Sequence, residues 1–542
     1  MVHHGLVWPA AGHATAVAIQ ADRILASGSD DQLSGLISPK TRVVDAAGGL
    51  IMPGFNDAHI HFLDGARNLE NLELSAETTV AGVLARIREF AAANPDREWL
   101  LGRGWFYAVF EGGMPHRGLL DRLVPDRPVA LEAYDGHTTW VNGAALARLR
   151  IDDATAHPPR GEIQRDAAGH ATGILKEAAM ELVDRAVPAR TSSQDLDSLA
   201  QAIRLAHRHG LTSVQEAGAD FEQFEIYRAL ATSGLPRIRI RLGQRMEPGL
   251  KMADWERRLA HYEEVAFPRR ADPWISGGIV KAFADGVIES GTAMMLEPYE
   301  GLDASQPAAR GRPQWEPGEL AEAVRIADAR GWQVQIHGIG DGAVRLALDA
   351  YESAVARNPP RERRHRIEHI ETVDPSDIPR FSGLGVIASM QPYHGDPEPA
   401  QLDLFTSKIG RDRASRGWVW RSILDAGGRL AFGSDWPVVS FDPRLGLNSA
   451  VHRTTADGRP AGGWLPEQRL SVAQALAGYT SGAAYAARQD RVVGTLAPGM
   501  LADLAILDQD ILTNQDRIIS ASVLATIVGG RVVYERNSLT SR

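Results

Sequence analysis

Two histidines separated by a single residue have the types and spacing to bind one divalent metal ion. His59 and His61 lie in the segment 54–62, directly after the apolar run 49–53, which is typical of a short buried strand. In an extended segment alternate side chains share a face, so both imidazoles point the same way. Neutral ring nitrogens of histidine are common metal ligands. Such a pair on its own is more often found in a surface loop, so the metal hypothesis depends on the rest of the chain.

The middle of the chain alternates predicted strands with predicted helices, which is the signature of a parallel sheet. Apolar runs predict strands at 212–215, 237–242, 278–283, 333–336, 365–368, 385–390 and 429–432. Helices are predicted at 195–209, 316–330 and 342–357, with two more that begin near residues 221 and 255. With the strand before His59 the count of strands is eight, which predicts a (β/α)8 TIM barrel in the α/β class.

The two ends of the chain share a β-rich texture that differs from the middle. Gly- and Asp-containing turns separate short predicted strands at 16–20, 41–45, 502–507, 525–528 and 532–534. We therefore expect residues 1–50 and 488–542 to form one small β domain, with the barrel spanning residues 51–487. A segment at about 68–190 interrupts the barrel rhythm after the first strand, and we expect it to be an insertion with strands of its own.

In a TIM barrel the active site lies at the C-terminal ends of the strands. The candidate residues at these ends are His59, His61, Lys281, His337, His369 and Asp435. Each residue has an ordinary explanation when taken singly, such as a helix cap. Because all of them fall at the ends of strands of the same predicted barrel, together they predict a metal centre. Lys281 is the unusual member, because a lysine in an apolar strand is costly to bury unless its charge is removed or paired. Nitrogen and oxygen ligands without sulfur suit Zn²⁺, and also Fe, Mn or Co.

The composition argues against several other classes of protein. The chain contains no Cys, which excludes disulfides and thiolate zinc sites. Its net charge of -10, without a basic stripe, argues against nucleic-acid binding. No apolar run approaches the length of a membrane span, and the first residues lack the pattern of a signal peptide. We therefore expect a cytoplasmic enzyme with a small-molecule substrate and no nucleic-acid or membrane partner.

Ordered motifs over nearly the whole chain resemble one known family. They are GFNDAHIH at 54–61, GHTTWVN at 136–142, TGILKE at 172–177, VKAFADG at 280–286, His337 with Gly340-Asp341, RIEH at 366–369 and GSD at 433–435. With these motifs the chain resembles the amidohydrolase superfamily. It is most similar to the amidohydrolase family 3 branch, which includes metal-dependent hydrolases similar to N-substituted formamide deformylase.

The resemblance implies a TIM barrel beside a small β-sandwich, with one or two divalent metal ions and Zn²⁺ as the first choice. The implied metal ligands are His59, His61, His337, His369 and Asp435. It also implies that CO₂ carboxylates the amine of Lys281 to a bridging carbamate, which would remove the buried positive charge. In the implied mechanism the metal lowers the pKa of a bound water towards ~7 and polarises the substrate carbonyl. Asp435 takes the proton of this water and returns it to the leaving nitrogen.

Other residues of the motifs are candidates for contact with the substrate. His137 either hydrogen-bonds the substrate carbonyl or makes a hydrogen bond within the insertion. Its segment could reach over the barrel mouth, and Trp140 and Asn142 of the same segment are therefore also candidates for contact with the substrate. His394, at the end of the seventh predicted strand, either faces the substrate or is solvated in a loop. Glu177 is interpreted as a structural carboxylate.

A group of aromatic residues in the insertion has two interpretations. It would act as a hydrophobic lid over the site or form the insertion's own core, and its members are Trp105, Phe106, Tyr107 and Phe110.

The leading functional hypothesis is hydrolysis of an amide-type C–N bond in an N-acyl or N-formyl amine. The first alternative is hydrolysis of a cyclic amide, carbamate, ester or lactone at the same site, because this fold supports many reactions. A second alternative is a metal-binding barrel without catalysis. Asp435 argues against it, because a structural metal site does not need a base at an open coordination position. Barrel enzymes of this type often form homo-oligomers, although no stretch of the sequence identifies an interface.

Overall fold

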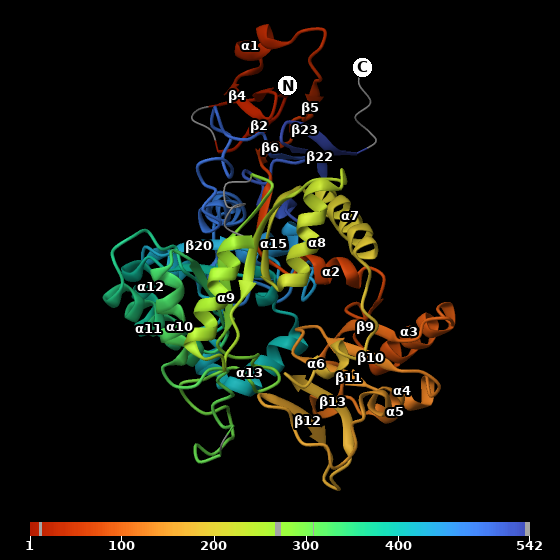
Figure 1. Ribbon diagram of the computed structural model, residues 1–542. Helices are drawn as coiled ribbons and strands as arrows, with labels where there is room; N and C mark the ends of the chain where they lie inside the picture. The colour runs from red at the N-terminus through yellow and green to blue at the C-terminus, as the bar shows by residue number, and fades with distance from the viewer. Residues whose placement is uncertain (10–12, 266–272, 307, 537–542) are drawn as a thin grey trace.

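Eight parallel strands form the centre of the molecule (Figure 1). The computed structural model describes residues 1–9, 13–265, 273–306 and 308–536. The strands pair with one another in chain order, and their connections contain helices, which confirms the predicted (β/α)8 barrel. They are β7 (Phe55–Ile60), β14 (Leu211–Ala219), β15 (Arg239–Arg245), β16 (Ile275–Phe283), β17 (Gln333–Gly338), β18 (Arg366–His369), β19 (Ile387–Met390) and β20 (Arg429–Phe432).

Helices follow most of these strands and begin at local signals in the sequence. Thr191 and Gln194 form a capping box before α7, and Asp220 and Gln223 form another before α8, so backbone donors at both helix starts are satisfied. The helices of the barrel part are α2 (Phe62–Asn68), α7 (Ser192–Arg208), α8 (Phe221–Thr232), α9 (Met252–Val265), α10 (Glu319–Ala329), α11 (Asp341–Arg357), α12 (Ile378–Leu384), α13 (Pro399–Ala414), α14 (Trp420–Asp425), α15 (Pro443–His452), α16 (Val472–Ala477) and α17 (Ala483–Ala486).

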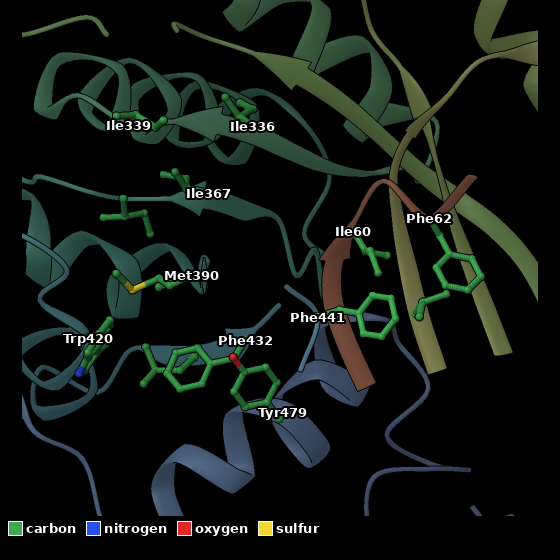
Figure 2. Packing of buried hydrophobic residues seen from close by; sticks show 14 of the residues in the cluster. Ile60, Phe62, Ile336, Ile339, Ile367, Met390, Trp420, Phe432, Phe441 and Tyr479 are labelled. Atoms are coloured by element: carbon green, nitrogen blue, oxygen red, sulfur yellow. The ribbon is translucent and has the colours of Figure 1, made fainter. Parts of the chain in front are cut away.

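Side chains of the barrel strands alternate between the surrounding core and the barrel interior. Four neighbouring strands each contribute an apolar side chain to the main hydrophobic cluster: Ile336, Ile367, Met390 and Phe432 (Figure 2). Burying one such side chain is worth about 1.5–3 kcal/mol. The residues that alternate with them include polar ones, and the Arg366 guanidinium donates hydrogen bonds to the side-chain oxygens of Gln215 and Gln335 from two other strands. The functional groups of the strands are therefore on the interior face.

The last strand joins the first without a regular ladder between them. The backbone N–H of Asp435 donates to the carbonyl oxygen of His59 at 2.7 Å. Ser434 donates twice to the carboxylate of Asp57, from its backbone N–H at 2.9 Å and from its hydroxyl at 2.5 Å. The closing seam of the barrel therefore passes directly beside the predicted metal ligands.

Both termini contribute to two sheets beside the barrel, where the red and blue ends of the chain meet in Figure 1. These sheets share one apolar core, which confirms the predicted β-sandwich built from the two ends. The four-stranded sheet contains β4 (Arg23–Gly28), β3 (Ala16–Gln20), β1 (Val2–His3) and β5 (Val44–Asp45). The five-stranded sheet contains β2 (Leu6–Val7), β6 (Leu50–Pro53), β21 (Leu504–Leu507), β22 (Val523–Val528) and β23 (Arg531–Glu535). The C-terminal end of the predicted segment 488–542 lies partly outside the described residues.

The apolar run before the two histidines does not belong to the barrel, which corrects the sequence-based prediction. This run is β6, which pairs with β2 and β21 in the five-stranded sheet. The first barrel strand is β7, which begins two residues later at Phe55. Both segments are extended and apolar, so their partners in space, and not their local patterns, decide which sheet each one joins.

The insertion after the first barrel strand forms a separate lobe with a six-stranded sheet (Figure 1). Its strands are β8 (Leu72–Glu73), β9 (Leu100–Trp105), β10 (Val129–Ala133), β11 (Thr138–Val141), β12 (Gly161–Arg165) and β13 (Ala171–Glu177). Its longer helices are α3 (Val80–Ala93), α4 (Arg117–Leu123) and α5 (Gly143–Leu149). Across the part of the chain that the structure describes, no helix has both the length and the apolar character to cross a membrane.

Candidate metal centre

His59, His369 and Asp435 come from three different strands and meet at the C-terminal end of the barrel. One ligand atom from each lies within 4.8 Å of the others. Asp435 Oδ1 is 3.3 Å from His59 Nε2, and Asp435 Oδ2 is 3.9 Å from His369 Nδ1. His369 has a φ of 74° and Asp435 a φ of 62°. Such left-handed backbone costs about 1–3 kcal/mol in a residue other than glycine and is concentrated at functional sites.

The other two predicted histidines lie in the same group. His61 Nε2 is 3.3 Å from Asp435 Oδ1, and the ring of His337 lies 4.4 Å from the ring of His369. His61 directly follows β7, and His337 is near the end of β17. The structure therefore brings together four histidines and one aspartate from strand ends that are far apart in the sequence.

The buried atoms of this group fit a divalent cation. His369 Nδ1 and Asp435 Oδ1 have almost no access to solvent and lack a hydrogen-bond partner among the described residues. Burial lowers the pKa of His337 and of His369 well below the usual value, so both imidazoles are neutral. Burial alone would raise the pKa of Asp435, but His59 and His61 hold it well below its usual range. Neutral imidazoles beside an ionised carboxylate are the donor set that such a cation requires.

Lys281 lies within the same group and is fully buried. Its Nζ is 3.4 Å from His59 Nε2 and 4.4 Å from the centre of the Phe283 ring. In the described parts of the chain it makes no ion pair with a carboxylate, and burial lowers its pKa to about 8. A lysine in this position is close to losing its charge, as its place in an apolar strand predicts.

The ring nitrogens that face away from the group have partners that the sequence motifs do not predict. His59 Nδ1 lies 2.7 Å from Glu368 Oε2, and His61 Nδ1 lies 3.9 Å from Glu216 Oε1. His337 Nε2 lies 3.2 Å from the carbonyl oxygen of Gly286. A signal was available for Glu368, because it directly precedes the predicted ligand His369, whereas Glu216 only follows the predicted strand 212–215.

His137 reaches the barrel mouth from the insertion. Its ring lies 5.5 Å from the ring of His337, and its Nδ1 lies 3.0 Å from Glu177 Oε2. Burial alone would lower the pKa of His137, but Glu177 and Asp135 raise it to about 9. His137 is therefore an imidazolium near neutral pH. Glu177 has a specific role in holding that charge, which is more than the structural role expected from the sequence.

His394 lies on the other side of the group, and its side chain is only 10% exposed, so it is not a solvated loop residue. Its ring stacks on His369 at 5.8 Å, and its Nε2 is 3.8 Å from Asp435 Oδ2. Glu371 Oε1 lies 3.6 Å from its Nδ1. Burial alone would lower the pKa of His394, but Glu371 and Asp435 raise it.

Trp140 and Asn142 do not belong to this group, which corrects their prediction as substrate contacts. Trp140 is fully buried in the core of the insertion, where its ring packs against Phe110. Asn142 caps α5 by accepting from the backbone N–H of Ala145, and it also accepts from that of Val129. Their proximity to His137 in the sequence reflects the fold of the insertion and not a shared site.

The aromatic group in the insertion is mainly core. The buried members that form its apolar cluster with Trp140 are Trp105, Tyr107 and Phe110. Phe106 packs against Tyr134, with ring centres 4.8 Å apart. These contacts favour the second of the two interpretations over a lid.

Comparison with known proteins agrees with the fold and shows the family. The family model described as amidohydrolase family matches residues 42–534. The chain is 33% identical to the protein LONG AFTER FAR-RED 3 of Arabidopsis thaliana, over 96% of this chain and 88% of that protein. It is 28% identical to the N-substituted formamide deformylase of Arthrobacter pascens, over 96% of this chain and 95% of that enzyme.

A solved structure shows the same fold over nearly the whole length. It is an uncharacterised metal-dependent hydrolase from Pyrococcus horikoshii, with a TM-score of 0.73, 23% identity, and coverage of 95% of this chain and 98% of that one. Because the family model spans most of the chain and the barrel carries the histidines and aspartate at its strand ends, the protein belongs to the amidohydrolase family and is a hydrolase of that family.

Proposed function

We propose that this protein is a metal-dependent hydrolase that cleaves the amide-type C–N bond of an N-acyl or N-formyl amine. The observation that carries the proposal is the buried pair of unpartnered atoms, His369 Nδ1 and Asp435 Oδ1, beside neutral imidazoles at the barrel mouth. The similarity to an N-substituted formamide deformylase supports the choice of bond.

The residues that would hold one or two divalent ions, with Zn²⁺ as the first choice, are His59, His61, His337, His369, Asp435 and a carboxylated Lys281. A divalent cation at this position supplies Lewis acidity, which polarises a carbonyl group and makes an attacking water more acidic.

Asp435 is suited to move the proton of the attacking water. Its carboxylate is ionised, because the neighbouring imidazoles hold its pKa well below the usual range. It can accept the proton as the water attacks and then donate it to the leaving nitrogen, which departs poorly as an anion.

His137 is suited to bind the carbonyl oxygen of the substrate. Its Nδ1 faces Glu177, so its second ring nitrogen is the one available to the mouth. As an imidazolium it would donate a charge-assisted hydrogen bond to an oxygen on which negative charge develops. His394, paired with Glu371, would contact the substrate from the opposite side of the group.

Lys281 has the environment expected for a carboxylated lysine. Its neutral amine would attack CO₂, which forms an N–C bond, releases one proton and leaves a carbamate anion. This reaction would replace a buried cation without an ion-pair partner by an oxygen donor next to His59.

The test is a hydrolysis screen on the purified protein, with metal content measured on the same preparation. We expect about one to two equivalents of Zn²⁺ or a similar ion per chain, and loss of turnover in a strong chelator. N-formyl, N-acetyl and long-acyl amines form the first panel, with lactones, esters, carbamates and cyclic amides as the second. Full turnover by metal-free protein would contradict the metal role, and turnover confined to the second panel would contradict the choice of bond.

A further inference from the structure

A carboxylate from the sixth barrel strand lies directly behind the metal-facing side of His59. Glu368 Oε2 is 2.7 Å from His59 Nδ1, and neither side chain has any exposed surface. On the other side of the same ring, His59 Nε2 lies 3.3 Å from Asp435 Oδ1 and 3.4 Å from Lys281 Nζ. The two nitrogens of this imidazole therefore face two different groups.

The position of Glu368 is set by the strand that carries it and by a fixed cation. Arg366 Nε lies 3.3 Å from Glu368 Oε1. The Arg366 guanidinium donates to the carbonyl oxygen of Ala58 at 3.1 Å and to Gln215 Oε1 at 2.7 Å, and it also donates to Gln335 Oε1. Because these acceptors come from three other barrel strands, neither the arginine nor its carboxylate partner has freedom to move away from His59.

A carboxylate accepts hydrogen bonds and cannot donate one when ionised, so Glu368 requires the proton of His59 on Nδ1. The lone pair of Nε2 then points toward Asp435 and Lys281, where a ligand is needed. We propose that Glu368 is a positioning residue that selects this tautomer of His59 and thereby sets the metal affinity of the centre. The inference rests on the metal-dependent function proposed above and assigns to Glu368 a role that the ligands themselves cannot perform.

A purely structural role for Glu368 makes a different prediction. If Glu368 served only to neutralise Arg366, its replacement would lower the stability of the fold and leave the metal affinity unchanged. The two roles are therefore separated by measuring metal affinity and thermal stability on the same variants.

Glu368→Gln is the informative substitution, because it keeps the size of the side chain. An amide has a single acceptor oxygen in place of two, and this side chain lies between the Arg366 cation and His59 Nδ1. If the oxygen faces Arg366, the amide NH₂ faces His59 Nδ1 and favours the opposite tautomer, with the proton on Nε2. We expect the metal affinity, measured by competition with a chromophoric zinc chelator, to fall by about 10- to 100-fold.

Glu368→Asp provides a second variant that does not remove charge. It retains a counter-charge for Arg366 but withdraws the carboxylate from His59 by one methylene. We expect Glu368→Asp to fold and to bind zinc more weakly than the parent, as Glu368→Gln does. If Glu368→Gln fails to fold, Glu368→Asp still tests the role of Glu368.

Asp328→Asn is the matched control, since Asp328 is the buried partner of a histidine at the opposite end of the same strand. Asp328 Oδ1 lies 3.2 Å from Nε2 of His365, the residue directly before β18. We expect this variant to lower the melting temperature without changing the metal affinity.

Three results distinguish the ideas. Weakened zinc binding in both Glu368 variants, with the control unchanged, supports the inference. Parent-like zinc binding in folded Glu368→Gln and Glu368→Asp would overturn it and leave the proposed function standing. A parent protein that binds no divalent metal would overturn both.

Discussion

Asp435 and Lys281 are both buried in one group, yet the charged form is favoured overall only for Asp435. Burial raises the pKa of an acid, but the imidazoles of His59 and His61 outweigh it and keep Asp435 ionised. Burial lowers the pKa of Lys281 to about 8, and Glu368 and Asp435 offset only part of that effect. Asp435 is therefore ionised and able to accept a proton, whereas a fraction of Lys281 is already the neutral amine near neutral pH.

The side chain of Asp435 can be tested separately from its backbone. Its backbone N–H closes the barrel seam, and Asp435→Asn leaves that bond in place. We expect the variant to fold and to keep most of its metal, because the histidine ligands remain. Its kcat should fall by about 1,000-fold or more, since an amide cannot carry the proton in either direction. A variant that keeps its metal and loses less than about tenfold in kcat would exclude Asp435 as the proton carrier.

Lys281→Ala tests the carbamate through an added acid. We expect the variant to lose metal, and short carboxylic acids to restore part of the metal content and turnover by occupying the space of the missing carbamate. Lys176→Ala is the matched control, because Lys176 is a buried lysine of the insertion whose pKa is also lowered by burial. Acids should have no effect on the control. A crystal structure of the parent with an unmodified amine and a loaded metal would refute the carbamate.

Strand periodicity in the sequence predicts most of the barrel, because apolar alternation and strand-helix order are local properties. The strand predicted at 333–336 is β17, and the helix predicted at 342–357 is α11 within one residue at its start. The error at 49–53 has a physical cause. β6 pairs with Ala505 and Ile506 of β21, more than 400 residues away, and no local pattern contains that information.

The candidate site was predictable to the extent that it follows from strand ends. The structure brings His59, His337 and Asp435 into one group, as expected, because a parallel barrel gathers its strand ends at one rim. Trp140 and Asn142 were misassigned because closeness to His137 in the chain was taken as closeness to the site. Their contacts instead depend on how the sheet of the insertion packs, which the motif alone does not determine.

The helix α7 contains a histidine that should make the fold sensitive to acid. Burial lowers the pKa of His207 to about 4, and its Nε2–H donates to the carbonyl oxygen of Arg237 at 3.1 Å. The unfolded chain binds the proton from roughly pH 6.5 downward. Between about pH 6.5 and pH 4 the unfolded state therefore binds more protons, and the stability that the neutral histidine supplies is lost as the pH falls through this window.

His207→Gln tests this contribution, since an amide can keep the bond to Arg237 but does not titrate. We expect the decrease in melting temperature between about pH 7 and about pH 5 to be smaller than in the parent. The control is His261→Gln, which changes a histidine that is about half exposed in α9, and it should show the parent's decrease. An unchanged decrease in His207→Gln would show that other groups account for the acid sensitivity.

Across the whole molecule, a buried ion pair connects the barrel to the terminal sheets. Arg239 of β15 donates to both carboxylate oxygens of Asp503, at 2.5 Å and 3.0 Å, and both side chains are almost fully buried. Asp503 also accepts from the backbone N–H of Gly529, next to β22. The carboxylate therefore links two parts of the chain that fold around separate apolar cores.

Asp503→Ala should destabilise the protein strongly, because it leaves Arg239 buried without its partner. We expect a cost of about 3–5 kcal/mol, seen as a clear fall in the urea midpoint. The matched control is Glu535→Ala, which removes the partner of Arg42 at the surface of the same terminal sheets and should cost at most about 1 kcal/mol. Equal effects of the two substitutions would contradict a special role for the buried pair.

The seam between β20 and β7 also determines the order in which the molecule can be built. Asp57 and Ser434, which hold this seam, are 377 positions apart in the chain. During synthesis His59 and His61 leave the ribosome early and have no Asp435 to meet until the last barrel strand has followed. Contacts over such sequence distances form late, because the intervening chain must first be organised. A nonsense mutation between codons 369 and 435 would therefore yield a protein that carries all four histidines of the group but lacks the last barrel strand or Asp435, so this truncation should abolish metal loading outright and not merely weaken the enzyme.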